Sequence, residues 1–196
     1  MKGSEKILGY IQKIVPLTQE EEEQFYNAFR PLHVKKRQFI IQPNFPVRQR
    51  NYVVDGAFRG YVIDEAGIDH TIQFAVEDWW ISDYNSYIFQ KPATMFVVAL
   101  EDSLVLELTY EKEQELKRSN HKFETFFRVM AERSGAFFQK RIISSLTLSA
   151  EQRYNEFLAT YPSVVQRLPQ YAVASYLGMT TEFLSRIRNK KTKKKS

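Results

Sequence analysis

The spacing of hydrophobic and polar residues changes twice along this chain, from helical to alternating and back to helical. Residues 4–14 carry a helical pattern that stops at Pro16, because proline cannot continue a helix. Thr18 and Glu21 have the spacing of a capping box, which opens a second helix that is expected to end near Arg30. The chain is therefore predicted to begin with two short helices.

From His33 to Thr109 the hydrophobic pattern has a period of two, which is typical of strands with one buried face. Glycine and proline separate the segments, and Asp64–Gly67 has the composition of a hairpin turn. Several short strands at close spacing predict an antiparallel barrel or sandwich. The predicted strands cover residues 39–41, 52–54, 59–63, 71–76 and 95–100.

Helical periodicity returns near Glu111, and a long helix with one broad apolar face is predicted over about residues 119–148. Such a face is wider than one small barrel would cover, so we predict a homodimer through this helix. Burial against the chain's own barrel is the alternative. The apolar residues of this face are Phe123, Phe126, Phe127, Met130, Phe137, Phe138, Ile142, Ile143 and Leu146.

A second capping box, at Ser149 and Gln152, begins a new helix that is expected to run through Leu158 and to end at Tyr161-Pro162. A boundary near Leu148 therefore predicts two domains. They cover residues 1–148 and 149–196.

The segment 170–188 has the residue spacing of a helix-turn-helix. The small side chain of Ala174 lets two helices cross closely, and Gly178 suits the positive φ of a tight turn. Thr180 is in position to cap the second helix. The apolar positions that would fix the angle between the helices are Val173, Leu177, Met179, Leu184 and Ile187.

A helix-turn-helix binds DNA by placing its second helix in the major groove, with the first turns facing the base edges. Arg186 can donate two hydrogen bonds to a guanine, and Glu182 can accept one from a cytosine amine. Thr181 and Ser185 suit a thymine methyl group or a phosphate. Gln170, Tyr171 and Lys190 are assigned to phosphates. The full set of predicted DNA-contacting residues is Gln170, Tyr171, Thr180, Thr181, Glu182, Ser185, Arg186, Arg188 and Lys190.

Charge is distributed unevenly along the chain. Residues 111–196 carry 17 Lys or Arg against 8 Asp or Glu, whereas residues 1–110 carry 11 against 15. A one-sided basic surplus suggests a polyanionic partner, and double-stranded DNA fits the spacing above. A solvated tail is the alternative, because residues 190–195 supply five of these lysines.

Several other classes of protein are not expected from this sequence. With no cysteine, the sequence excludes disulfides, thiolate metal sites and an iron–sulfur cluster. His33, His70 and His121 lie far apart, and no phosphate loop or nucleophilic serine motif occurs, so neither a metal site nor an enzyme is expected. No apolar run approaches the about 18 residues of a membrane span, and no signal-peptide core is present. We predict a cytoplasmic protein.

Over nearly its whole length the chain is similar to the catabolite-activator/Fnr (Crp/Fnr) family of transcription regulators, in particular to its short Bacteroidetes-type members. The resemblance implies an α+β fold: a cyclic-nucleotide-binding-type antiparallel β-barrel (jelly roll) flanked by helices, a long dimerisation helix and a helix-turn-helix. It also implies a pseudo-palindromic operator and makes RNA polymerase a candidate partner. The matching stretches are YVVDGAFRGY (52–61), WWISD (79–83), ALEDSLVL (99–106), SAEQRY (149–154) and the segment 170–188.

Two features depart from the family pattern. The positions that would hold the phosphate of a cyclic nucleotide are Ser82, Asp83, Ala93 and Thr94, and the phosphate-binding arginine is missing. This argues against cyclic AMP and leaves an unidentified small-molecule effector, or none. Trp79-Trp80 would be barrel core or the lining of a small-molecule pocket.

The second departure is at the C-terminus, because only eight residues follow Arg188. We therefore expect a helix-turn-helix that lacks the β-hairpin wing, with the lysines of the tail as substitute phosphate contacts. A rival interpretation is a ligand-binding sensor or interaction module whose DNA-binding unit has degenerated.

Overall fold

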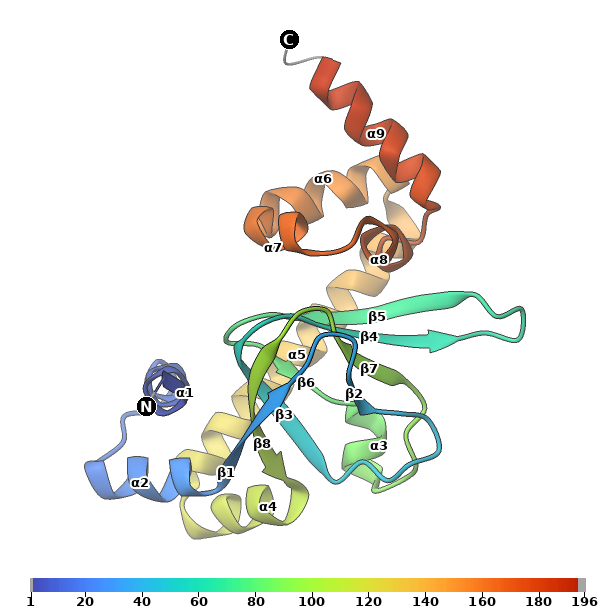
Figure 1. The fold of residues 1–196 in the computed structure, drawn as a ribbon. Coiled ribbons are helices and arrows are strands. Elements are labelled where there is room, and N and C mark those ends of the chain that lie inside the picture. Colours follow the sequence, from blue (N-terminus) through green and yellow to red (C-terminus); the bar gives the residue numbers. More distant parts are fainter. Residues whose placement is uncertain (1, 194–196) are drawn as a thin grey trace.

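Eight strands form two antiparallel four-stranded sheets in the computed structural model, which describes residues 2–193 (Figure 1). The five segments expected to be strands all form strands, and the turn at Asp64–Gly67 joins two of them. The strands are β1 Phe29–Val34, β2 Phe39–Ile41, β3 Gln49–Asp55, β4 Phe58–Ile63, β5 Asp69–Ala75, β6 Trp80–Ile81, β7 Phe96–Ala99 and β8 Ser103–Thr109.

The first sheet has the strand order β1-β8-β3-β6 and the second β2-β7-β4-β5. Val53 and Val105 of the first sheet share a buried cluster with Phe58 and Val97 of the second. The two sheets therefore face each other across one apolar core. The closed barrel expected from the sequence is not observed, because the ladders between the described strands end at β1 and β6 in one sheet and at β2 and β5 in the other.

The outer face of the first sheet is covered by α1 (Lys2–Gln12), α2 (Gln19–Asn27) and the beginning of the long helix α5 (His121–Thr147). Ile7, Phe25 and Phe126 are fully buried there against Leu106 and Leu108 of β8. Alternate residues of β8 thus face the two cores on either side of this sheet, as the period of two requires. The capping box that opens α2 is confirmed.

The second helix ends at Asn27, earlier than the sequence pattern predicts. Phe29 packs on Phe25 with ring centroids 5.1 Å apart and pairs with Leu108 in the sheet, so tertiary packing takes this segment out of the helix. Pro31 is tolerated in β1 because β1 is an edge strand, where a missing N–H need not cost a ladder hydrogen bond.

The long helix α5 follows α3 (Tyr84–Phe89) and α4 (Tyr110–Ser119) and begins after Asn120, whose side chain caps it. Its apolar face divides into two parts. Phe123, Phe126 and Phe127 are buried in the chain's own core, whereas Ile142 and Leu146 are 60% and 80% exposed. The first half of the helix therefore follows the alternative of burial within the chain, and the second half leaves apolar side chains uncovered.

Four helices complete the described chain at one end of the molecule, beside the β4–β5 hairpin (Figure 1). The capping box at Ser149 and Gln152 is confirmed at the start of the first of them. Phe74 and Val76, at the end of β5, share a buried cluster with residues of these helices. The helices are α6 Ala150–Thr160, α7 Pro162–Arg167, α8 Gln170–Tyr176 and α9 Thr181–Lys193.

Of the helices within the described part of the chain, none is long and apolar enough to cross a lipid bilayer. The end of the lysine-rich tail, residues 194–196, lies outside the described residues.

Candidate nucleic-acid interface and sensor cavity

The turn between α8 and α9 depends on a left-handed residue at Gly178, which has a φ of 65°. A Cβ at this position would meet only the Arg153 guanidinium, at 3.7 Å, so backbone conformation rather than space selects glycine here. The N–H of Met179 returns to the carbonyl of Ala174 at 3.0 Å and closes the end of α8. The turn that the sequence spacing predicts is therefore present.

The contacts between α8 and α9 come from the apolar positions expected to set their angle. Ala174, at 1% exposure, allows the close approach, and Thr180 accepts a hydrogen bond from the N–H of Phe183 at 3.2 Å. This bond is the helix cap expected at Thr180. The buried residues of the pair are Ala172, Val173, Ala174, Leu177, Leu184 and Ile187, and Met179 is half-buried.

Glu182, Arg186 and Lys190 lie on one exposed face of α9, at successive turns of the helix. Hydrogen bonds from its own backbone N–H and from the side chain of Thr180 lower the pKa of Glu182, so this carboxylate is ionised at neutral pH. The Arg186 guanidinium lies 5.3 Å from the ring centroid of Phe183. Neither charged residue predicted to read bases is packed inward.

The remaining candidates on α9 surround this face. Thr181 and Ser185 are half-buried, and Thr180 and Arg188 are exposed.

Gln170 and Tyr171 lie on α8, and Tyr171 contacts the second sheet. The ring of Tyr171, which is 49% exposed, lies 5.1 Å from the guanidinium carbon of Arg59 on β4. Gln170 is half-buried. The structure therefore places the predicted base-reading residues on one face of α9 and the predicted phosphate contact Tyr171 beside the sheet.

The free edge of β5 is bound by side chains of α5 and α8. The hydroxyl of Ser175 accepts from the N–H of Thr71 and donates to the carbonyl of Asp69, both at 2.9 Å. Arg141 donates to the carbonyls of Thr71 at 2.9 Å and Tyr176 at 3.2 Å, and also to the carbonyl of Ile72. We call these contacts of Ser175 and Arg141 the β5 clasp.

The guanidinium of Arg141 is largely removed from water, and this desolvation lowers its pKa. A second link between the two parts of the chain is formed by Arg167 of α7, which pairs with Glu77 at 2.7 Å and with Glu101. The C-terminal helices are thus joined to the sheet by charged contacts as well as by the buried cluster.

In the segment considered for a cyclic-nucleotide phosphate, the backbone N–H donors bind the carboxylate of Asp83. Asp83 caps α3 and accepts hydrogen bonds from the N–H groups of Ser86 (3.1 Å), Thr94 (2.7 Å) and Met95 (3.2 Å), and from the Thr94 hydroxyl (2.9 Å). Burial alone would raise the pKa of Asp83, but the hydrogen bonds from Thr94 and Ser86 outweigh it and lower the pKa. The Asp83 carboxylate therefore has hydrogen-bond partners within the chain itself.

The two remaining residues of that segment also have structural partners. The Ser82 hydroxyl donates to the carbonyl of Gln49 at 3.1 Å, and Ala93 is buried in the core between the sheets. A phosphate in this segment would have to compete with Asp83 for the same backbone donors.

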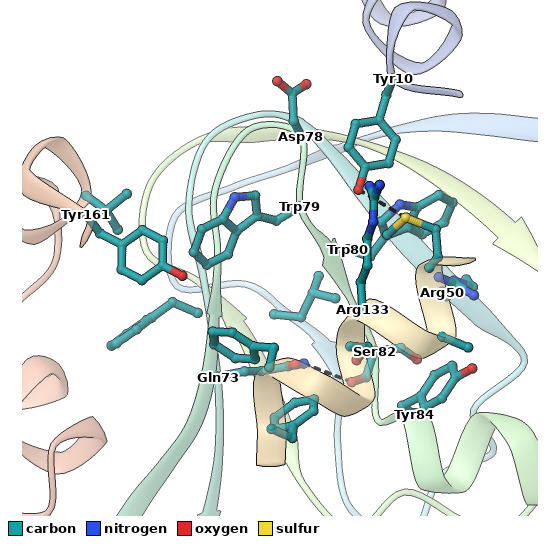
Figure 2. Close-up of a pocket in the computed structure, with 18 of the residues that line it drawn as sticks. Tyr10, Arg50, Gln73, Asp78, Trp79, Trp80, Ser82, Tyr84, Arg133 and Tyr161 are labelled. Atoms are coloured by element: carbon teal, nitrogen blue, oxygen red, sulfur yellow. Dashed lines mark hydrogen bonds between the residues drawn. The ribbon is translucent and has the colours of Figure 1, made fainter. Parts of the chain in front are cut away.

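A cavity of about 530 Å³, here called the junction cavity, lies where β5, β6, α5 and the C-terminal helices meet (Figure 2). Its wall includes Phe74, Phe137 and Tyr161 together with Trp79 and Trp80, the two tryptophans of the chain. This volume is in the range of small-molecule sites, about 300–1,000 Å³. The tryptophans line this pocket and also pack against the buried clusters, so both interpretations that the sequence left open apply to them.

Within residues 2–193 the structure contains no group of three or more His, Cys, Asp or Glu residues that could hold a metal ion. His70 instead lies 2.7 Å from Asp64 in the β4–β5 hairpin.

No protein-family model and no curated protein matches this sequence. Solved structures do match. FixK2 from Bradyrhizobium japonicum has 15% identity and a TM-score of 0.76, with 85% of each chain covered. The c-di-GMP-responsive global regulator CLP of Xanthomonas campestris has 12% identity and a TM-score of 0.72, covering 90% of this chain and 93% of its own. A transcriptional regulator assigned to the Crp/Fnr family, from Eubacterium rectale, has 16% identity and a TM-score of 0.69, covering 91% and 85%.

The chain has the fold of the Crp/Fnr regulators. The likeness extends over 85–91% of this chain. At 12–16% identity it concerns the fold, so the function of this Crp/Fnr-fold chain has to be derived from its own residues.

Two groups of residues in this Crp/Fnr fold escaped the sequence analysis. The clasp residues Ser175 and Arg141 carry no local signal, because their partners are backbone atoms of a strand far away in the sequence. The wall of the junction cavity combines Tyr10, Phe74 and Tyr161 from three separate parts of the chain. Of the lining residues, only the pair Trp79-Trp80 had been considered as the lining of a pocket.

Proposed function

We propose that this chain is a sequence-specific DNA-binding transcription regulator that acts as a homodimer. The observation that carries the proposal is the exposure of Glu182 and Arg186 on one face of α9, directly after a capped tight turn. In the proposal α8 and α9 form a helix-turn-helix, and α9 enters the major groove. Residues 149–196 are then the DNA-binding unit and residues 1–148 the sensor and dimerisation unit, whose two sheets form a jelly roll of the cyclic-nucleotide-binding type.

The residues on α9 suit the reading of bases. Glu182 and Arg186 are four residues apart, which separates their positions by about 6 Å along the helix axis and allows them to reach neighbouring base pairs. Arg186 donates two hydrogen bonds to a guanine, and the ionised Glu182 accepts one from a cytosine amine. Lys190, one turn further along, contacts a phosphate and supplies affinity without sequence preference.

The second half of α5 supports the dimer. Ile142, Ile143 and Leu146 are 60%, 54% and 80% exposed, and such side chains are stabilised by burial against an identical helix. A two-fold axis along this pairing would place two copies of α9 about 34 Å apart, in successive major grooves of a pseudo-palindromic site.

Arg186→Ala is expected to weaken binding to a duplex obtained by selection from random sequences by about 1–3 kcal/mol, with little effect on random duplex. The reason is that Arg186 reads a base in this proposal. Lys190→Ala is the matched control on the same helix, and it should weaken both duplexes alike and reduce the salt slope by about one. Fluorescence anisotropy at several salt concentrations measures both quantities. Equal losses for Arg186→Ala on the two duplexes would contradict a base-reading role.

Leu146→Glu is expected to convert the dimer into a monomer, because it puts a charge into the centre of the proposed helix pairing. Light scattering during size-exclusion chromatography, at about 10 μM protein, should give twice the chain mass of 23.2 kDa for the unmodified protein and the chain mass itself for the variant. Lys140→Glu, an exposed site on the same helix, is the control and should stay dimeric. A monomeric unmodified protein would remove the dimer from the proposal.

A ligand-binding sensor without a DNA site is the second candidate, and the junction cavity favours it. The two candidates differ in one result. Selection from random duplex at physiological salt enriches a two-fold-symmetric motif if the first is correct and enriches no motif if the second is correct.

A further inference from the structure

The junction cavity is partly open to solvent and is lined by elements from several parts of the chain. Gln73 and Ile81 of the strands form one side, Ser134 of α5 another, and Tyr161 and Tyr176 of the C-terminal helices a third. Its volume of about 530 Å³ is sufficient for a ligand with about ten carbon atoms. Of the segment considered for a cyclic nucleotide, Ser82 lines the cavity, whereas Asp83, Ala93 and Thr94 are not among its lining residues.

The wall of the cavity is mainly aromatic. Trp79 meets Tyr161 edge to face, with ring centroids 5.2 Å apart, and Trp80 is held by the guanidinium of Arg50 at 4.2 Å from its ring centroid (Figure 2). Phe74 and Phe137 add two further rings. Such a surface favours an apolar ligand body, because binding removes apolar surface of both the ligand and the cavity from water.

The charged residues of the wall determine whether the cavity favours a cationic or an anionic ligand. Three lining residues are charged: Arg50, Asp78 and Arg133. Arg50 pairs with Glu113 at 3.3 Å, and exposed Asp78 accepts a hydrogen bond from Tyr52 at 2.6 Å.

Arg133 differs from these residues, because it has no ion pair with any residue whose side chain the structure describes. It extends from α5 toward Tyr10 at the cavity (Figure 2). The Nε1–H of Trp80 is buried in the wall and likewise lacks a hydrogen-bond acceptor among the described residues. A guanidinium without a carboxylate partner and an unmatched N–H donor, both in the wall of the same cavity, suit an anion.

We infer that the junction cavity binds an apolar carboxylate of about ten carbon atoms, with its body against the rings of Trp79, Trp80 and Phe137 and its carboxylate on Arg133. The inference rests on the cavity alone and does not require DNA binding. Because the ligand would touch the strands, α5 and the C-terminal helices together, it would stabilise their present arrangement.

The test uses decanoate and its neutral counterpart decan-1-ol as probes, with the full-length protein. Both tryptophans line the cavity, so their fluorescence reports binding directly, and neither probe absorbs at the excitation wavelength. We expect saturable binding of decanoate and at least about tenfold weaker binding of decan-1-ol, because only the carboxylate pairs with the guanidinium. Absence of saturable binding, or equal affinity for the two probes, would overturn the inference.

Three variants assign the binding to the proposed site. Arg133→Gln should reduce the affinity for decanoate to that of decan-1-ol and leave decan-1-ol unaffected. Lys140→Gln removes a positive charge from the same helix outside the cavity and should change neither affinity. Ser134→Phe fills the cavity and should abolish binding of both probes while the circular dichroism spectrum is retained. An equal effect of Arg133→Gln and Lys140→Gln, or binding that survives Ser134→Phe, would place the carboxylate elsewhere.

Discussion

Replacing Glu113 with glutamine is expected to lower the free energy of unfolding by about 3–5 kcal/mol, because it removes the negative member of a buried charge cluster. The Glu113 side chain is 1% exposed, lies 2.6 Å from Lys117 and 3.3 Å from Arg50, and accepts a hydrogen bond from the Tyr87 hydroxyl at 2.9 Å. Glutamine keeps the shape of the side chain but leaves the guanidinium of Arg50 without a counter-charge in a buried position. Urea denaturation followed by circular dichroism measures the difference.

The matched control is Glu115→Gln on the same helix. Glu115 pairs with Lys112, at 2.7 Å, and both side chains are more than half exposed. Exposed pairs of this kind contribute about 0–1 kcal/mol, so the control should unfold almost as the unmodified protein does. If the two variants lost similar stability, burial of the cluster would not be the cause.

Arg141→Met is expected to destabilise the docking of the C-terminal helices on β5 by about 2–4 kcal/mol. Methionine has a similar length but donates no hydrogen bond, so it leaves the carbonyls of Thr71, Ile72 and Tyr176 without this donor. The amide of Thr71 is a direct reporter, because its N–H donates to Ser175 of α8. Hydrogen exchange followed by NMR should give about 30-fold or greater loss of protection at this amide.

Lys140→Met on the same helix serves as the control for the Arg141 variant, since Lys140 is exposed. It should leave the exchange of the Thr71 amide unchanged. Unchanged protection in Arg141→Met would mean that the buried cluster of apolar residues holds the helices without the β5 clasp.

Local signals in the sequence were sufficient for the elements whose ends are fixed by neighbouring residues. The capping boxes at Thr18 and Ser149 and the left-handed turn at Gly178 each depend on contacts within a few residues, and all three are present. The helix predicted after Thr18 is too long at its C-terminal end. The residues that follow it form β1 because they pair with β8, and this pairing cannot be read from the local sequence.

Other elements were missed because their signal is too short or too distant. Strand β6 has two residues, and α3 has six, so neither contains a full hydrophobic repeat. Asp83 was compared with a phosphate site, whereas it caps α3 by accepting from the N–H of Ser86 and also accepts from the N–H of Thr94, which a loop brings back to it. The exposed face of α9 was predictable from the segment itself, but the position of Tyr171 beside Arg59 was not.

The β5 clasp has a consequence for solubility. A strand at the edge of a sheet offers unpaired backbone groups that can pair with a strand of another molecule. Here Ser175 and Arg141 occupy the groups of Asp69, Thr71 and Ile72 on such an edge, in place of a neighbouring strand. Any motion that moves α8 away from the sheet therefore uncovers the N–H of Thr71 and the carbonyl of Asp69 for pairing with another molecule. Docking of α8 thus protects this edge against aggregation, together with Arg141 of α5.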